Sequence, residues 1–485
     1  MSSSDHPNVL LITADHWPAA LLGSAGHPAI MTPTLDQMAR NGVRFSNALS
    51  ACPICVPARR TLMTGLSPRG HSLRRNANKA MPEVPTLAES FRANGYQTGA
   101  VGKLHVHPQR NPIGFENVLL NEEGRGLGAG IGPDDWEMSL AKGGFAGQEY
   151  AGGGNNNDYF VTPWHLPDDC HQTSWTAREM CRMIHDRDTS RPGFWYLSFA
   201  APHPPLWPLN SYLDMYRNRA IPEAAIGEWV DNLRPDAPAP LRQRLEGLAT
   251  TDAPAATIDL AIRAFYAMAT HIDHQIRVVL GTLFEEGILG NTSVVFTSDH
   301  GDMLGQHRMW GKCVMYEPSI NVPLIIAPPA NRKFKSCGTV DDRIVELRDI
   351  FPTVLDLAGL PTPAHLEGYS AFSETRRTQL YGEYGEAAGA TRMLREERFK
   401  LIYYPEGNHF QLFDLVEDPQ ECRDLSGNPL QKEILSRLQA ALIREFYDDD
   451  ESWLQNGQLA GLPAKPGGPS TSLNYGGQRG YRFRE

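Results

Sequence analysis

Four short, uninterrupted apolar segments constrain the fold of this 485-residue chain more than any other feature of its sequence. They lie at residues 8–14, 194–200, 293–297 and 322–327. Apolar runs without alternation are typical of strands that are buried on both faces of a parallel sheet. Helical patterns lie between them, near residues 32–42, 86–95 and 258–286. This alternation predicts an α/β fold with a doubly wound, mostly parallel sheet that is flanked by helices.

Polar residues stand directly after the predicted strands, one of which is a further short strand at residues 98–101. The residues in these positions are Asp15, Lys103, His203 and the pair Asp299-His300. Ligand-binding and catalytic groups of open α/β sheets collect beyond the carboxyl ends of the strands. The sequence therefore predicts a functional site at that edge of the sheet.

The rest of the chain is expected to form a smaller unit. We assign residues 1–371 to the large α/β domain, and residues 372–462 to a C-terminal α+β unit with an antiparallel sheet. Residues 391–415 resemble two or three antiparallel strands, and a helix is predicted from 429 to 446. The Gly- and Pro-rich residues 463–485 are expected to form a tail, which could link copies of the chain into a homo-oligomer as an exchanged arm.

Composition excludes several classes of protein. Lys and Arg number 45 against 56 Asp and Glu, and the formal charge of −11 argues against nucleic acid or an anionic membrane as a partner. No apolar run reaches the ~18 residues that indicate a membrane-spanning helix. The N-terminal residues lack the basic and apolar regions of a secretory signal, so a cytoplasmic location is expected. Seven scattered cysteines, an odd number, do not indicate a disulfide framework.

Cys52 and Cys55 have the CxxC spacing of redox and zinc sites. Such a role needs a thioredoxin-like context or a second pair of ligands, and the sequence offers neither. The sharper pattern begins at the second cysteine and runs Cys55-Val-Pro-Ala-Arg59, followed by Thr64-Gly65.

A second polar cluster follows the strand at 293–297, with the order Asp299-His300-Gly301-Asp302. A carboxylate and an imidazole at adjacent positions can reach one metal ion from a sharp turn. Asp15, at the end of another strand, could complete the ligand set. The cluster therefore favours a site for a divalent metal ion.

These segments resemble, in order and over most of the chain, the type I sulfatases of the alkaline phosphatase superfamily. The segments that carry the resemblance are residues 8–15, 55–65, 86–105, 202–204, 298–312, 349–359 and 413–419, together with Asp273. The resemblance implies hydrolysis of a small-molecule sulfate ester. It also implies that a formylglycine-generating maturation enzyme converts Cys55 to formylglycine, whose hydrated gem-diol is the nucleophile. Sulfate oxygens repel nucleophiles, so such a reaction requires an activated oxygen and strong charge neutralisation.

The resemblance further implies a role for each matching residue. Asp15, Asp299 and His300 would bind one divalent metal ion together with an oxygen of the modified Cys55. Arg59 would hold the modified side chain. The remaining groups would act on the substrate, with sulfate binding by Lys103 and Lys312, protonation of the leaving alkoxide by His203 together with Lys312, and base catalysis of the second step by His105.

Two departures distinguish this chain from many arylsulfatases. Asp15-His16 stands where they carry Asp-Asp, and Asp299-His300 stands where they carry Asp-Asn. Both pairs look more like the choline-sulfatase and phosphonate monoester hydrolase branches. An imidazole in place of an oxygen ligand makes manganese as plausible as calcium. The sequence assigns no role to His16 or His107.

We therefore predict a sulfuric ester hydrolase that is arylsulfatase-like in assays. A phosphonate monoester or phosphodiester hydrolase with the same site, or an enzyme promiscuous between the two, is the first alternative. A binding protein on the same fold with unmodified Cys55 is the second. The natural alcohol stays open between a small cationic group, an aryl ring and a sugar.

Overall fold

Eight strands form the central sheet in the computed structural model, which describes residues 6–123, 132–153, 156–233, 237–246, 253–329 and 337–464. Across the sheet their order is β4-β3-β5-β1-β6-β7-β2-β8. Their bounds are β1 Asn8–Ala14, β2 Val43–Leu49, β3 Gln97–Gly102, β4 Asn117–Leu120, β5 Gly193–Phe199, β6 Thr292–Ser298, β7 Asn321–Ala327 and β8 Thr339–Glu346.

Four adjacent strands of the sheet, β3, β5, β1 and β6, are all parallel to one another. Their last residues lie side by side, since Ala14 pairs with Phe199 on one side and with Ser298 on the other. Strand β7 is antiparallel to both of its neighbours, β6 and β2. The α/β prediction is confirmed, and the sheet is mixed because of this one reversed strand.

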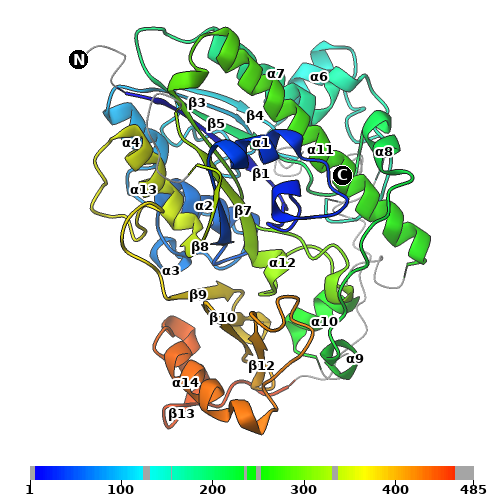
Figure 1. The fold of residues 1–485 in the computed structure, drawn as a ribbon, viewed down its shortest axis with the longest axis vertical. Coiled ribbons are helices and arrows are strands. Elements are labelled where there is room, and N and C mark those ends of the chain that lie inside the picture. The colour runs from blue at the N-terminus through cyan, green and yellow to red at the C-terminus, as the bar shows by residue number, and fades with distance from the viewer. Residues whose placement is uncertain are drawn as a thin grey trace.

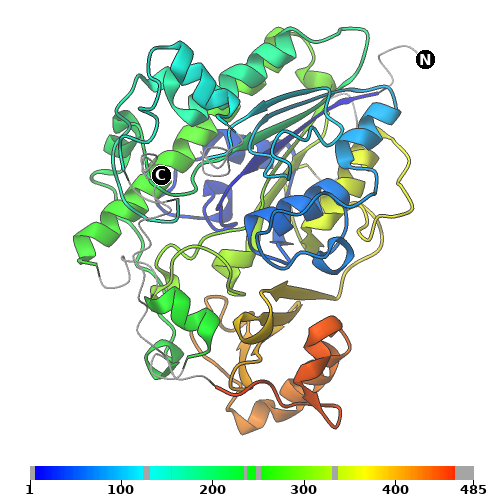
Figure 2. The same cartoon turned by 180° about the vertical axis from the view of Figure 1, so that it is seen from behind.

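Strand β1 buries side chains on both faces of the sheet, as its continuous apolar sequence predicts. Leu10 and Ile12 pack into one hydrophobic cluster with residues of α1, α7 and α11, whereas Val9 and Leu11 pack into another with residues of α2, α4 and α13. Figures 1 and 2 show these two layers of helices from opposite sides of the molecule. The bounds are α1 Pro33–Asn41, α2 Cys55–Thr64, α4 Leu87–Ala93, α7 Gln172–His185, α11 Ala255–Glu285 and α13 Leu347–Ala358.

Shorter elements lie between these. They are α3 Pro68–His71, α6 Asp135–Lys142, α8 Asn210–Tyr216, α9 Trp229–Leu233, α10 Ala239–Glu246 and α12 Glu317–Ile320, with the small hairpin of β13 Leu454–Gln455 and β14 Gln458–Leu459. Among the helices of the described ranges, none combines the length and the apolar character that crossing a bilayer requires. None of the seven cysteines forms a disulfide bond, as expected.

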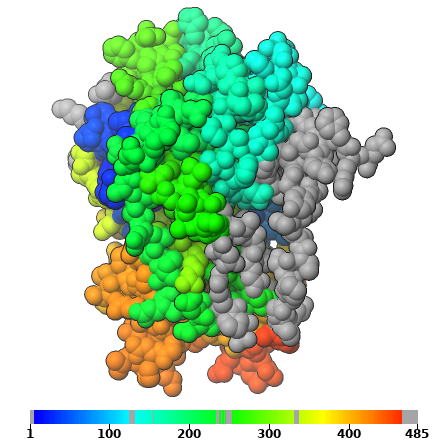
Figure 3. Space-filling view, turned by 90° about the vertical axis from the view of Figure 1, so that its right-hand side faces the viewer, coloured from blue at the N-terminus to red at the C-terminus, as the bar shows by residue number. Residues whose placement is uncertain are grey.

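A second, antiparallel sheet forms the smaller unit at one end of the molecule, coloured orange to red in Figure 3. Its strands are β9 Gln379–Tyr384, β10 Thr391–Glu396, β11 Phe399–Tyr404 and β12 His409–Asp414, in sequential antiparallel order. Helix α14, Lys432–Ile443, follows a short 3₁₀ turn and packs against β10 and β11. The predicted C-terminal sheet and helix are confirmed. The domain boundary near residue 372 stays a prediction, and residues 465–485 of the expected tail lie outside the described residues.

A buried ion pair ties this smaller unit together and to the large one. Arg392 of β10 donates to both carboxylate oxygens of Asp450, at 2.6 and 2.7 Å. Arg74, from the segment after α3, donates to the same carboxylate at 3.1 Å. Arg392 is fully buried, so removal of Asp450 would leave an uncompensated charge inside the protein.

Candidate active site

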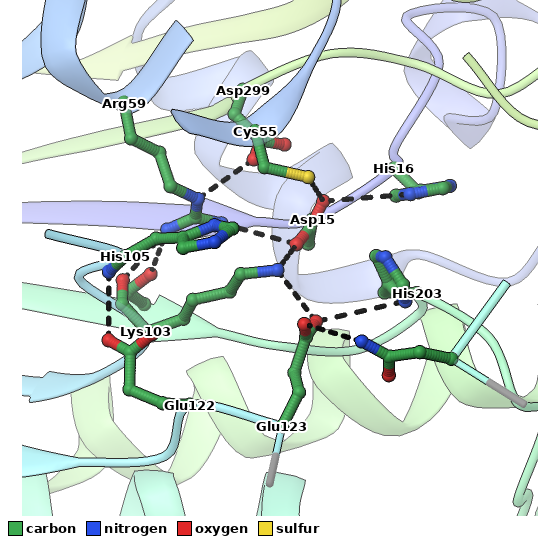
Figure 4. Close-up of polar contacts among 12 residues, drawn as sticks. Asp15, His16, Cys55, Arg59, Lys103, His105, Glu122, Glu123, His203 and Asp299 are labelled. Atoms are coloured by element: carbon green, nitrogen blue, oxygen red, sulfur yellow. Dashed lines mark hydrogen bonds and ion pairs between the residues drawn. The ribbon is translucent and has the colours of Figure 1, made fainter. Parts of the chain in front are cut away.

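The strand-end residues that the sequence singles out converge at the carboxyl edge of the sheet (Figure 4). Asp15 follows β1, Lys103 follows β3, and Asp299 and His300 follow β6. The Nζ atom of Lys103 contacts the carboxylate of Asp15, and Nε2 of His300 lies 3.5 Å from its Oδ1 atom. His203, four residues beyond β5, joins the same group. All five side chains are buried.

Helix α2 brings two further predicted residues to this edge. Cys55 is its first residue, and the preceding Ile54 has extended backbone angles, so the helix begins at the site. The positive end of the helix dipole therefore lies at Cys55. Arg59 lies one turn later and donates from Nε to Asp299 at 2.8 Å and from Nη1 to the carbonyl oxygen of Lys103 at 2.8 Å.

A set of potential metal ligands surrounds the sulfur of Cys55. Ligand atoms of Asp15, His16, Cys55 and His300 all lie within 4.8 Å of one another. Nδ1 of His300 donates to the carbonyl oxygen of Gly301 at 3.0 Å, which orients Nε2 toward the sulfur, 3.3 Å away. This arrangement fixes the tautomer in which Nε2 has a free lone pair for a metal ion.

Asp299 stands at the side of this set. Its Oδ1 atom lies 3.8 Å from Nε2 of His300, while Oδ2 accepts from Arg59. One oxygen therefore faces the ligand cluster and the other is held by the guanidinium. Two carboxylates, one imidazole and residue 55 are a donor set that suits a divalent cation.

His16, to which the sequence assigns no role, uses both ring nitrogens on protein partners. Nδ1 donates to Asp302 at 2.7 Å, and Nε2 accepts from the ammonium group of Lys312. The phenol of Tyr159 also donates to Asp302. Because its nitrogens are occupied, His16 fits a supporting role for Lys312 better than a role as metal ligand.

Lys312 connects His16 with His203. Its Nζ atom lies 3.0 Å from Nε2 of His203, whose Nδ1 donates to the carbonyl oxygen of Pro204 at 2.6 Å. Burial lowers the pKa of His203 to about 3, so this imidazole is neutral at pH 7.

Glu123 is a functional candidate that sequence reasoning missed. Its Oε1 atom lies 2.6 Å from Nζ of Lys103 and 3.7 Å from Nδ1 of His203. The neighbouring Glu122 accepts from the backbone N–H groups of Leu104 and His105, both at 2.8 Å. These two glutamates follow strand β4, so the strand-end rule would have found them if the short segment at 117–120 had been recognised as a strand.

The side chain of Cys55 has an unusual electrostatic environment. Burial opposes ionisation, but Lys312, Lys103 and His300 overcome it and hold the pKa of the thiol well below its ordinary value, with a hydrogen bond from His105. Cys52 has the opposite environment, because burial and Glu383 raise its pKa. The two cysteines of the CxxC spacing therefore do not act as one pair, and only Cys55 faces the cation-rich site.

A cavity of about 410 Å³ opens next to this site. Its lining includes His16, His203 and Lys312 of this site, and side chains from other segments, among them Asn76, Arg244 and Tyr384. Its volume lies in the range of roughly 300–1,000 Å³ that is common for small-molecule sites. Three of the converging side chains thus line a cavity that is large enough for a small molecule.

Comparison with known proteins agrees with this geometry. The sequence profile of the sulfatase family matches residues 7–360, and a profile described as N-sulphoglucosamine sulphohydrolase, C-terminal, matches residues 305–447. An arylsulfatase of Clostridium perfringens is 33% identical over 93% of this chain and 97% of its own length. A choline-sulfatase of Rhizobium meliloti is 28% identical over 87% of this chain and 83% of its own length.

Among solved structures, the phosphonate monoester hydrolase of Agrobacterium radiobacter superposes with a TM-score of 0.76. It is 25% identical and is covered over 99% of its length by 94% of this chain. The family match covers well over half of the chain, and the fold of a superfamily member extends over nearly all of it. The chain therefore belongs to the type I sulfatases of the alkaline phosphatase superfamily and is a sulfuric ester hydrolase.

Proposed function

We propose that the chain hydrolyses sulfate monoesters with residue 55 as the nucleophile, after Cys55 has been converted to formylglycine and hydrated. The observation that supports this most directly is the position of the Cys55 sulfur, 3.3 Å from Nε2 of His300 and 3.9 Å from Oδ1 of Asp15. An oxygen at this place would lie beside candidate metal ligands and in the positive field of Lys312 and Lys103. The second hydroxyl of the gem-diol allows the enzyme to regenerate. When this hydroxyl loses its proton, the sulfated intermediate collapses to the aldehyde and expels sulfate.

We further propose that Asp15, Asp299, His300 and an oxygen of modified residue 55 bind one divalent metal ion, calcium or manganese. The four positions lie together, and two carboxylates with one imidazole suit either ion. A bound cation would lower the pKa of the residue-55 hydroxyl and neutralise charge on the sulfate.

Three cationic side chains of the protein serve the anionic substrate. Lys312 and Lys103 both lie near enough to residue 55 to lower the pKa of its thiol, so their ammonium groups can bind the oxygens of a sulfate that reacts there. Arg59 stays buried behind residue 55, fixed by Asp299 and by Oγ of Ser198 at 2.8 Å. Its role is to hold the nucleophile and the carboxylate in place and to contribute positive charge.

The leaving alcohol receives its proton from the pair of Lys312 and His203. Nδ1 of His203 is held by a backbone carbonyl, so only Nε2 faces the site, and this atom shares the proton of Lys312. His105 has a different task. Its side chain hydrogen-bonds to residue 55, where it can accept the proton of the second hydroxyl when the sulfated intermediate collapses.

A phosphonate monoester hydrolase is the second candidate, supported by the Asp299-His300 pair and by the similarity to the Agrobacterium radiobacter enzyme. Sulfate monoesters and phosphonate monoesters are both singly charged tetrahedral anions, so the cations of the site suit both. We expect kcat/KM for 4-nitrophenyl sulfate to exceed that for a 4-nitrophenyl phosphonate ester when the two are measured side by side on mature enzyme. Phosphonate turnover far above sulfate turnover would reverse the ranking.

The metal assignment predicts that Asp299→Ala loses both the ion and activity. Removal of this carboxylate deletes a ligand and leaves Arg59 without its 2.8 Å partner, so activity should fall by about 10³-fold or more. Metal content, measured by elemental analysis, should fall in parallel. The matched control is Asp302→Asn, three residues further along, whose carboxylate contacts His16 and Tyr159 and which should keep its metal. Normal metal content in Asp299→Ala would contradict the assignment.

If His203 takes part in protonating the leaving alcohol, His203→Ala should lower kcat/KM most for esters whose leaving groups are poor. Alkyl sulfates need the proton and should lose about 10²–10⁴-fold in kcat/KM, whereas 4-nitrophenyl sulfate should lose much less. His105→Ala is the matched control, because the alcohol has already left before His105 acts. In that variant, slow collapse of the intermediate should make kcat similar for all esters. An equal loss for all leaving groups in His203→Ala would remove His203 from the acid role.

The maturation enzyme and a cytoplasmic location stay predictions of the sequence. The maturation step is supported by the pattern Cys55-Val-Pro-Ala-Arg59 and by membership of the sulfatase family.

A further inference from the structure

The described lining of the cavity beside the site carries positive charge without any acidic side chain. Its lining side chains include Lys312 and Arg244, which are cations, and the two imidazoles of His16 and His203. None of the described residues that line it is an aspartate or a glutamate. In the proposed function Lys312 binds the sulfate group of the substrate. The leaving alcohol would then extend into the rest of the cavity, whose lining includes a second cation, Arg244.

Arg244 lies close to the catalytic end of the cavity. It belongs to α10, and its Nη1 atom would lie 3.4 Å from a Cβ atom placed on Gly311, the residue directly before Lys312. The hydroxyl of Tyr159 would lie 3.5 Å from the same point. A ligand group bound by Arg244 would therefore lie next to the reacting sulfate, within the span of one small molecule.

The guanidinium of Arg244 has no carboxylate within ion-pair distance among the described residues. Burial lowers the pKa of Arg244, but Cys313, Tyr384, Tyr159 and, least of these, Asp302 raise it above its ordinary value. The oxygens of Asp302 are already used, by His16 at 2.7 Å and by the backbone N–H groups of Leu304 and Gly311 at 2.9 and 3.0 Å. A half-buried arginine that faces a cavity without a counterion is a binding site for an anion.

A neighbouring side chain adds a second donor. Asn76 accepts from the backbone N–H of Val56 with Oδ1 at 3.0 Å, so its amide nitrogen is the group that remains for a ligand. Amide donors beside a guanidinium suit hydroxyl and carboxylate oxygens. A quaternary ammonium group would find no carboxylate in the described lining and would meet the charge of Arg244.

We propose that the natural substrate is a sulfate ester whose alcohol carries a second anionic group, a carboxylate or a further sulfate, on a sugar-sized polar scaffold, and that Arg244 binds this group. This inference rests on the proposed function, because it places the reacting sulfate at Lys312. It restricts the leaving group to an alcohol that carries a carboxylate or sulfate group, and it excludes choline as the preferred leaving group.

A matched pair of substrates tests this inference. Glucuronic acid and glucose with a sulfate on the same hydroxyl differ only in the carboxylate, and choline sulfate and 4-nitrophenyl sulfate complete the panel. Wild-type enzyme should prefer the sulfated glucuronate to the sulfated glucose by about 10- to 100-fold in kcat/KM, the usual range for a charge-assisted hydrogen bond. A disulfated glucose should gain in the same way if the second anion is a sulfate.

Arg244→Gln should lower this preference by about 10-fold or more, whereas Arg244→Lys, which keeps the charge, should retain part of it. Arg308→Gln is the control, because Arg308 is a partly exposed arginine that pairs with Asp231 and does not line the cavity. It should leave the preference unchanged. Thermal unfolding of each variant checks that the fold is intact.

The outcomes separate this inference from the proposed function. If mature enzyme cleaves none of the sulfate esters, the proposed function fails. If it cleaves 4-nitrophenyl sulfate but prefers choline sulfate or the neutral sugar sulfate, or if Arg244→Gln keeps the preference, only the role of Arg244 is overturned.

Discussion

The site depends on one buried carboxylate, that of Asp15, and on the cations that compensate it. Burial and the neighbouring Cys55 thiolate raise the pKa of Asp15, but the positive charges of Lys103 and Arg59 outweigh them, so the carboxylate stays ionised. A buried carboxylate destabilises the folded protein strongly unless it is paired with a cation and hydrogen-bonded. The same cations that stabilise Asp15 form the positive wall that an anionic ester needs. In the proposed function, metal binding, nucleophile activation and substrate attraction would thus all depend on one charge-balanced cluster at the carboxyl edge of the parallel strands.

Much of this cluster could be predicted from the sequence. Continuous apolar strands fix the sheet, and the rule that functional groups follow strand ends identifies Asp15, Lys103, His203 and the pair at 299–300 without any family knowledge. Cys55 is the first residue of a helix and does not follow a strand, so this rule does not identify it. Its role and that of Arg59 are indicated only by the resemblance to sulfatases. The choice between sulfate and phosphonate stays open at this level because both substrates present the same charge and shape.

Other features could not be predicted from a single sequence, for physical reasons. The sequence does not reveal that β7 runs antiparallel to its neighbours, because a buried parallel strand and a buried antiparallel strand can have the same apolar sequence. Strand β2 has only a half-buried pattern, with polar side chains at Arg44, Ser46 and Asn47. Glu123 matters because it contacts Lys103 and His203, and Arg244 matters because it lines the cavity without an ion-paired carboxylate, and only the folded chain shows either arrangement. Substrate selectivity is therefore a property of tertiary packing more than of motif.

The proposed function depends above all on residue 55, where the thiol-bearing carbon of Cys55 is oxidised to an aldehyde and hydrated, and one hydroxyl oxygen of the resulting gem-diol carries out the displacement. Mass spectrometry of the peptide that contains this residue tests it most directly, on protein produced together with a formylglycine-generating enzyme. The account predicts an aldehyde or its hydrate at position 55, with specific activity in proportion to the converted fraction. Fully active enzyme that carries only the free Cys55 thiol would contradict it.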